Sequence, residues 1–145
     1  MSRGEMMKVI VGAGGTGGHL YPALALVEYI KEVEPDSEFL FVGTKDRIRI
    51  RSSTSTWLWI YWFKCSRVSW KYLLKRGLLL LFLLNQFLQT KKIVKKFKPD
   101  IVIGFGGYPS ASVVEAANRL GYKTMIHEQN SIIGLTNKIL IKKCW

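Results

Sequence analysis

Five of the seven residues from Gly12 to Gly18 are glycines, and His19 follows them directly. A glycine loop between a strand and a helix points backbone N–H groups at an anion. Glycine suits this task because it has no Cβ to keep phosphate oxygens from the main chain, and because it tolerates positive φ. The stretch therefore predicts an anion-binding loop. The alternative is a tight turn without a ligand, although a turn alone needs only one or two glycines.

His19 adds a possible proton acceptor to this loop. A neutral imidazole can take a proton from a hydroxyl near pH 7, so His19 is a candidate general base. A structural histidine that braces the loop is the alternative. Two further clusters could share the same chemistry, namely Gly104-Phe-Gly-Gly-Tyr-Pro-Ser110 and His127-Glu-Gln-Asn130, and each follows an apolar run.

The spacing of apolar residues predicts the elements that position these clusters. Strands are expected at 9–11, 38–42, 101–103 and 123–126. Helices are expected at 22–33 with Pro22 in the first turn, at 72–97, at 111–120 with Ser110 or Ser112 near the cap, and at 135–141. Alternating strands and helices indicate an α/β fold with a Rossmann-like parallel sheet and helices on both faces. Ligands of such sheets bind at the carboxyl ends of the strands, so loops 12–19, 104–110 and 127–130 should converge.

Composition limits the class of protein further. The chain has 145 residues, 48% of them hydrophobic, which is enough for one domain with a core. Its two cysteines are far apart, so neither a metal site nor a disulfide framework is expected. The net charge is +12, and residues 45–98 hold 14 of the 22 Lys and Arg but only one of the 10 acidic residues. The basic character therefore belongs to one region, which could face nucleic acid, an anionic membrane or a phosphorylated substrate.

That basic region has two parts. Residues 45–70 combine alternating Arg and Ile with four of the five tryptophans, which suggests one or two strands and a membrane interface or a stacking surface. Residues 72–97 are expected to form an apolar helix flanked by cations. Its uninterrupted apolar run, Leu78–Leu84, is far shorter than the ~20 residues that span a bilayer. A helix lying on an anionic interface and an ordinary core-facing helix both fit this composition.

Other ligands fit the glycine loop less well. The pattern Gly12-x-Gly14-x-x-Gly17 matches the dinucleotide fingerprint, but no acidic residue ends the second strand to bind a ribose. A P-loop is excluded because no Gly-Lys-Ser/Thr follows the glycines. No motif for reading nucleic acid is present, so we expect no nucleic-acid partner.

The whole set of motifs resembles a known family. In order along the chain stand Gly14–His19 with Pro22, Gly43–Arg47, Lys98–Gly104, Gly106–Tyr108, His127–Asn130 and Gly134–Asn137. Over about 8–47 and 71–143 this sequence is similar to the N-terminal domain of the bacterial N-acetylglucosaminyltransferases of family 28. Those GT-B enzymes convert lipid I to lipid II in peptidoglycan synthesis.

The resemblance implies roles for single residues. The donor would be UDP-N-acetylglucosamine, contacted from this domain by Thr16, Gly17, Gly18 and Asn130. The acceptor would be a polyprenyl-pyrophosphate-linked muramyl-pentapeptide (lipid I), and its pyrophosphate would meet the glycine loops at Gly14, Gly15, Gly106, Gly107 and Tyr108. His19 would be the catalytic residue. Within the cleft, His127 would hydrogen-bond to the wall, Glu128 could orient a loop or an acceptor group, and Gln129 lies between Glu128 and Asn130. No cofactor and no metal are implied.

The resemblance also implies a location and a missing part. Helix 72–97 is similar to the family's membrane-association patch, here Lys71, Lys75, Arg76, Leu79, Phe82 and Leu83. The protein would then be peripheral, on the cytoplasmic face of the bacterial inner membrane. The family needs a C-terminal donor domain, so 1–145 is expected to be an incomplete N-terminal acceptor-binding domain that is inactive alone. A non-catalytic membrane-binding module or a subunit of a split glycosyltransferase is the alternative function.

Residues 48–70 depart from the family pattern. Arg49 stands where a Glu usually follows the Gly-Thr-x-Asp-Arg segment, and the tryptophan-rich stretch replaces an ordinary strand. A compensated pair of frameshifts would explain matching flanks around a core that does not match. A genuine membrane-adapted insertion is the competing explanation.

Overall fold

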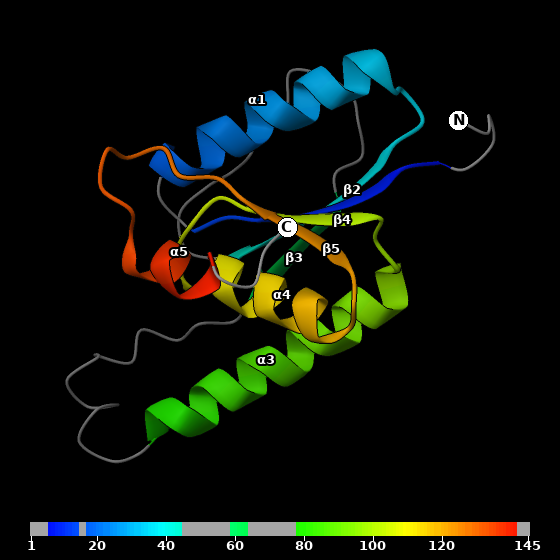
Figure 1. Cartoon of the computed structure of the whole chain (residues 1–145). Helices are drawn as coiled ribbons and strands as arrows, with labels where there is room; N and C mark the ends of the chain where they lie inside the picture. Colours follow the sequence, from blue (N-terminus) through cyan, green and yellow to red (C-terminus); the bar gives the residue numbers. More distant parts are fainter. Residues whose placement is uncertain (1–5, 15–16, 45–58, 64–77, 142–145) are drawn as a thin grey trace.

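A parallel sheet of five strands forms the centre of the molecule (Figure 1). The structure is a computed structural model that describes residues 6–14, 17–44, 59–63 and 78–141. The strands lie in the order β3-β2-β1-β4-β5. Their bounds are Lys8–Gly12 for β1, Glu38–Thr44 for β2, Trp59–Phe63 for β3, Ile101–Gly104 for β4 and Lys123–Ile126 for β5.

Strand β1 lies in the middle of the sheet and is buried on both faces. Val9, Ile10 and Val11 are 0% exposed. Val9 pairs with Phe39 of β2 on one side and with Ile101 of β4 on the other. A parallel strand covered on both faces must be apolar at every position, and three successive β-branched residues meet that need.

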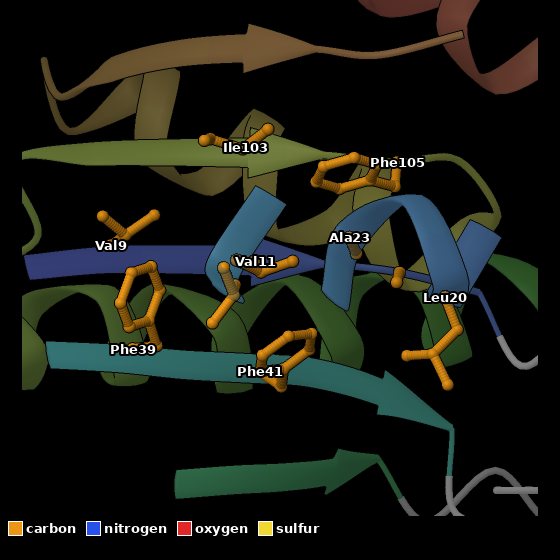
Figure 2. Packing of buried hydrophobic residues seen from close by; sticks show 10 residues of the cluster. Val9, Val11, Leu20, Ala23, Phe39, Phe41, Ile103 and Phe105 are labelled. Carbon is orange, nitrogen blue, oxygen red and sulfur yellow. The ribbon is translucent and has the colours of Figure 1, made fainter. Parts of the chain in front are cut away.

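Helices cover both faces of the sheet, as predicted. Helix α1 (Gly17–Val33) packs on one face, and α3 (Leu78–Phe97), α4 (Tyr108–Arg119) and α5 (Leu135–Leu140) lie on the other (Figure 1). Figure 2 shows the first of two apolar cores, in which Leu20 and Ala23 of α1 meet alternate side chains of the sheet. The second core joins the opposite face to Val94, Val113 and Leu140. The Rossmann-like α/β fold is therefore confirmed.

Two helix starts differ from the sequence-based expectation. Helix α1 begins at Gly17, so Pro22 lies inside the helix and not in its first turn. Proline lacks a backbone N–H, but its fixed φ is helical, and the helix continues through it. Helix α4 begins at Tyr108 after the N-cap residue Gly107, and no side chain caps it. The prediction of a Ser110 or Ser112 cap was wrong, because the positive φ of Gly106 and Gly107 ends the loop early and Pro109 favours a helical start.

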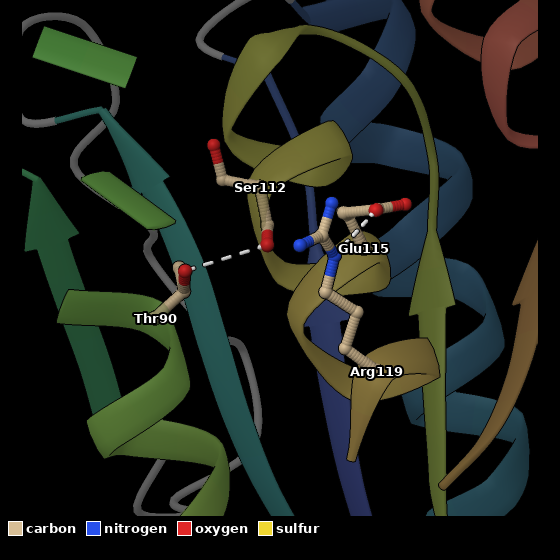
Figure 3. Close-up of polar contacts among 4 residues, drawn as sticks. All are labelled: Thr90, Ser112, Glu115 and Arg119. Carbon is tan, nitrogen blue, oxygen red and sulfur yellow. Dashed lines mark hydrogen bonds and ion pairs between the residues drawn. The ribbon is translucent and has the colours of Figure 1, made fainter. Parts of the chain in front are cut away.

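The interface between α3 and α4 contains a buried polar contact (Figure 3). Thr90 of α3 is 0% exposed, and its hydroxyl oxygen lies 2.9 Å from the carbonyl oxygens of Gln86 and Phe87 on its own helix and 3.3 Å from that of Ser112 on α4. On α4, Arg119 pairs with Glu115 at 2.8 Å, and its guanidinium lies over the ring of Phe87 at 5.0 Å. The Thr90–Ser112 contact and the stacking of Arg119 on Phe87 join α3 to α4, whereas the Arg119–Glu115 pair lies within α4.

The tryptophan-rich segment contributes the edge strand β3. The pairing of Leu40 with Trp59 and of Thr44 with Phe63 sets its parallel register against β2. One or two strands were predicted in this segment from its alternation; β3 is one strand, and the rest of 45–70 lies outside the described residues. Among the residues that the structure describes, no helix is both long and apolar enough to cross a membrane.

Candidate functional site

The direction of the chain across the sheet reverses between β1 and β4. From β1 the chain builds β2 and β3 on one side, and then returns to place β4 and β5 on the other side. At such a switch point the loops that leave two neighbouring strands diverge and open a crevice at their carboxyl ends. In this protein those loops are the two glycine-rich segments.

The two glycine loops are in direct contact. The N–H of Gly14 donates to the carbonyl of Gly106 at 2.9 Å, and the N–H of Phe105 donates to the carbonyl of Gly12 at 2.8 Å. A Cβ on Gly107 would lie 2.8 Å from the Cα of Gly14, and φ at Gly107 is +81°. Only glycine meets both requirements, because a side chain would separate the loops and strain the backbone.

His19 lies where these loops meet. A Cβ added to Gly14 would be 3.1 Å from its Cδ2 atom, and one added to Gly106 would be 2.7 Å from its Cε1 atom. The imidazole therefore packs against the backbone of both loops. It is carried by the first turn of α1, which begins at Gly17.

The segment that follows β5, residues 127–130, also contacts loop 104–110 and His19. The N–H of His127 donates to the carbonyl of Gly104 at 2.8 Å, and its ring lies 5.2 Å from that of Phe105. Two residues further on, the side-chain amide of Gln129 makes a hydrogen bond to Nδ1 of His19. The structure thus brings together loops 12–19, 104–110 and 127–130.

Glu128 organises the loop that carries Gln129. One carboxylate oxygen accepts from the backbone N–H and the side chain of Asn130 at 3.1 and 2.9 Å. The other accepts from the N–H of Gly134 and from Asn137 at 2.9 and 3.0 Å. Hydrogen bonds from the N–H groups of Gly134 and Asn130, and then from the two asparagine side chains, lower the pKa of Glu128 to about 2. The carboxylate therefore holds its own loop and is charged at neutral pH.

Asn137 belongs to this site, although no role was predicted for it. It is 2% exposed, and its side-chain amide donates to the carbonyl of His127 at 3.1 Å as well as to Glu128. It ties α5 to the loop after β5. The available signal was its place at the end of the motif Gly134–Asn137.

Of the other predicted site residues, the structure describes some and leaves others outside the described residues. Gly17 and Gly18 open α1, Tyr108 is the first residue of α4, and Asn130 is held by Glu128. Gly15 and Thr16 lie outside the described residues, as do Lys71, Lys75 and Arg76. Leu79, Phe82 and Leu83 belong to α3, but their side chains are not described. The binding roles of all these residues remain predictions.

The arrangement suits an anionic ligand. Helices α1 and α4 both begin beside the contact between Gly14 and Gly106, so the N-terminal N–H groups of two helices lie at one place. Such ends carry partial positive charge and free donors, which favour phosphate. With His19 between the loops, the site can combine phosphate binding with a neutral nitrogen ligand or proton carrier.

A parallel sheet with helices on both faces, and with such loops at its switch point, defines a Rossmann-like domain of the kind that forms half of a GT-B glycosyltransferase. The sequence profile of the glycosyltransferase family 28 N-terminal domain matches residues 9–144. The chain therefore belongs to glycosyltransferase family 28.

Two relatives illustrate the similarity. The chain is 42% identical over 136 residues to the UDP-N-acetylglucosamine–N-acetylmuramyl-(pentapeptide) pyrophosphoryl-undecaprenol N-acetylglucosamine transferase of Limosilactobacillus fermentum. It is 45% identical over 136 residues to the protein of the same name from Leuconostoc citreum. Each comparison covers 94% of this chain and 37% of the relative. The chain thus spans little more than a third of the length of these relatives.

Solved structures agree with this placement. The chain superposes on Acinetobacter baumannii MurG with a TM-score of 0.78 and 28% identity, covering 95% of this chain and 40% of that one. A UGT transferase from Siraitia grosvenorii in complex with UDP gives a TM-score of 0.58 at 14% identity, which supports the fold alone. The resemblance to a family 28 N-terminal domain is confirmed.

Proposed function

We propose that this chain supplies the N-terminal, acceptor-binding part of a transferase that moves N-acetylglucosamine from UDP-N-acetylglucosamine to a polyprenyl-pyrophosphate-linked muramyl-pentapeptide. The observation that carries this proposal is the meeting of two glycine loops and the 127–130 segment around His19. The names of the L. fermentum and L. citreum relatives supply the substrate class.

Different residues of the cleft would bind the acceptor and the donor. The glycine loops at Gly14, Gly106 and Gly107 would hold the acceptor pyrophosphate, together with Gly15 and Tyr108. Gly17, Gly18 and Asn130 would contact the donor, together with Thr16. His19, between the two groups, would touch the reacting oxygens. Glu128 would not bind the acceptor, because both of its oxygens already accept hydrogen bonds within its own loop.

The activity would need a second part. The chain covers only 37% of the L. fermentum relative. A separate or attached C-terminal donor domain would therefore complete the site. The test is to coexpress this chain with the part of the L. fermentum relative that follows the matched region, and to measure transfer of labelled N-acetylglucosamine to lipid I.

Transfer by the pair, with none by either part alone, would support the proposal. A pair that copurifies and binds UDP-N-acetylglucosamine but transfers nothing, under conditions in which the full-length relative is active, would contradict it.

A second function, binding to an anionic membrane surface, is favoured by the outer face of α3. Leu84 and Leu88 are 49% and 55% exposed, and they lie one turn apart. Lys92, Lys95 and Lys96 continue the helix as exposed cations. Exposed leucines beside lysines allow a helix to insert its apolar groups among lipid headgroups while its charges contact anionic lipids. The protein would then be peripheral, on the cytoplasmic face of the bacterial inner membrane.

A further inference from the structure

The contact between Gln129 and His19 joins residues that are 110 positions apart in the sequence. The side-chain nitrogen of Gln129 is the donor, and Nδ1 of the imidazole is the acceptor. The other end of the amide, Oε1, is buried and has no hydrogen-bond partner among the described residues. Gln129 is therefore engaged with His19 through its NH₂ group.

The two orientations of the amide make opposite demands on the ring. In the structure the NH₂ group faces Nδ1, and Oε1 has no hydrogen-bond donor among the described residues. A reversed amide would place Oε1 against Nδ1, which would then have to carry a proton. The orientation in the structure therefore corresponds to a ring whose Nδ1 is unprotonated.

The ring has little freedom to escape this contact. The Cδ2 atom faces Gly14 and would lie 3.1 Å from a Cβ added there. The Cε1 and Nδ1 atoms face Gly106 and would lie 2.7 and 2.8 Å from a Cβ added to that residue. The glycine loops therefore hold the ring plane, and Gln129 determines what lies at Nδ1.

The hydrogen bond determines which nitrogen carries the proton. A neutral imidazole has one N–H donor and one acceptor nitrogen. If Nδ1 accepts from Gln129, Nε2 must carry the proton, as the partner of one ring nitrogen generally fixes the state of the other. The lone pair of Nδ1, which is the only one that could remove a proton from a hydroxyl, is then occupied by the amide of Gln129. Among the described residues, the structure shows no hydrogen bond to Nε2, so the Nε2 N–H is the donor that a ligand would meet.

Building on the proposed transferase function, we infer that Gln129 is a positioning residue that holds neutral His19 with its proton on Nε2. His19 then serves as a hydrogen-bond donor to the phosphate oxygen that leaves with UDP when the sugar–phosphate bond breaks. It does not serve as a general base, so the proton of the attacking acceptor hydroxyl passes to water. This refines the role expected of His19 from the sequence, where a proton-accepting nitrogen was predicted.

The test is a measurement of the protonated nitrogen of His19 by ¹H–¹⁵N NMR. The chain contains two histidines, so labelling of histidine alone gives two rings, and a His127→Gln variant assigns them. Spectra are recorded about two pH units above the ordinary histidine value of about 6.5, where neutral rings dominate. The variants are Gln129→Glu, whose carboxylate only accepts, and Gln129→Leu, which does neither. Gln89→Leu on α3 is the matched control.

The wild-type and Gln89→Leu chains should carry the His19 proton on Nε2. Gln129→Glu should move it to Nδ1, and Gln129→Leu should give a mixture of the two tautomers. A wild-type ring protonated on Nδ1, or a tautomer that does not respond to Gln129→Glu in a folded chain, would overturn the inference. This readout needs no catalytic activity, so it decides the point even if the proposed transfer reaction fails.

The same variants separate donor from base in the coexpressed pair. Only rings that keep the Nε2 proton are competent donors, so moving it in about 90% of rings should lower kcat about tenfold. If His19 were a base, Gln129→Glu would free Nε2 to accept a proton, and kcat would hold or rise. An unchanged or raised kcat in the Gln129→Glu pair would therefore overturn the donor role.

Discussion

The carboxylate of Glu128 links stability to pH at the scale of single residues. Its pKa is lowered from 4.5 to about 2 in the folded chain, chiefly by the N–H groups of Gly134 and Asn130. A group with a lowered folded pKa stabilises the protein above its unfolded pKa, and this stabilisation is lost as the pH falls toward the folded pKa. The stabilisation by Glu128 should therefore be complete near neutral pH and disappear between pH 4.5 and about 2.

We expect Glu128→Gln to lower the urea midpoint near pH 7, and we expect its difference from the wild type to shrink as the pH falls to about 3. Urea unfolding followed by circular dichroism at several pH values measures both. The control is Glu32→Gln, an exposed residue on α1, which should unfold with the wild type. A Glu128→Gln difference that grows in acid would contradict the assigned role.

Gly106 is the glycine whose replacement should disturb the site most directly. Its φ is +104°, and a Cβ would lie 2.7 Å from the ring of His19. Gly106→Ala should lower the free energy of unfolding by about 1–3 kcal/mol because of backbone strain, and should displace the imidazole. Urea unfolding and the NMR signals of His19 measure the two effects.

Gly18→Ala is the matched control for this change. An added Cβ there meets nothing within 4 Å, and Gly18 lies in α1. The substitution should raise the free energy of unfolding by about 0.5 kcal/mol, because alanine loses less backbone entropy on folding. Equal effects of the two substitutions would show that the loops are not packed as described.

For single residues, the sequence predicted which loops would meet better than it predicted the hydrogen bonds between them. The glycine loops and His19 were predicted because each directly follows a strand, so neighbouring residues in the sequence were enough to recognise them. The bond from Gln129 to His19 was not predictable, since it depends on how three crossovers place separate loops. The burial of Asn137 was also missed, because a six-residue helix has too short a periodicity to show which side faces inward.

At the scale of elements, α3 has an inner face that supports the sheet. Val94 is 0% exposed and belongs to the core formed with Val113 and Leu140. Val94→Ala should lower the free energy of unfolding by about 2 kcal/mol, through lost burial and the cavity that remains. Leu88→Ala, on the 55% exposed side of the same helix, should change it little. Similar losses at both positions would contradict this orientation of α3.

The outer face of α3 should bind membranes. Leu84→Glu with Leu88→Glu should reduce cosedimentation with vesicles that contain phosphatidylglycerol about tenfold, since both exposed leucines would lose their place among the lipids. The matched control is Tyr29→Glu with Val33→Glu on α1, which has the same spacing and charge on the opposite face of the sheet. Added salt should weaken wild-type binding. Equal loss in both double variants would contradict a specific role for α3.

The sequence predicted most elements because their apolar patterns were long. It was wrong about where α1 and α4 begin. In both cases glycines precede the helix, and rules based on proline or serine placed the start several residues too late. Backbone geometry at Gly106 and Gly107, with φ of +104° and +81°, decides the start of α4, and residue type alone does not reveal those angles.

At the scale of the whole molecule, the order β3-β2-β1-β4-β5 explains why the site lies where it does. The loops that follow β1 and β4 touch at Gly14 and Gly106, beyond which the chain continues to opposite sides of the sheet, and both loops are glycine-rich. The sequence predicted a parallel sheet and a common cleft, but not the strand order, which depends on nonlocal pairing.

The most direct test of the account is the effect of His19→Ala on transfer by the coexpressed pair. Loss of a hydrogen-bond donor aimed at charge in the transition state should lower kcat about 10²–10³-fold. The Glu32→Gln pair should keep the wild-type rate, and the His19→Ala chain should still copurify with its partner. If the His19→Ala pair transfers N-acetylglucosamine as fast as the wild type, His19 only braces the loops, and the claim that this cleft performs the transfer through His19 is contradicted.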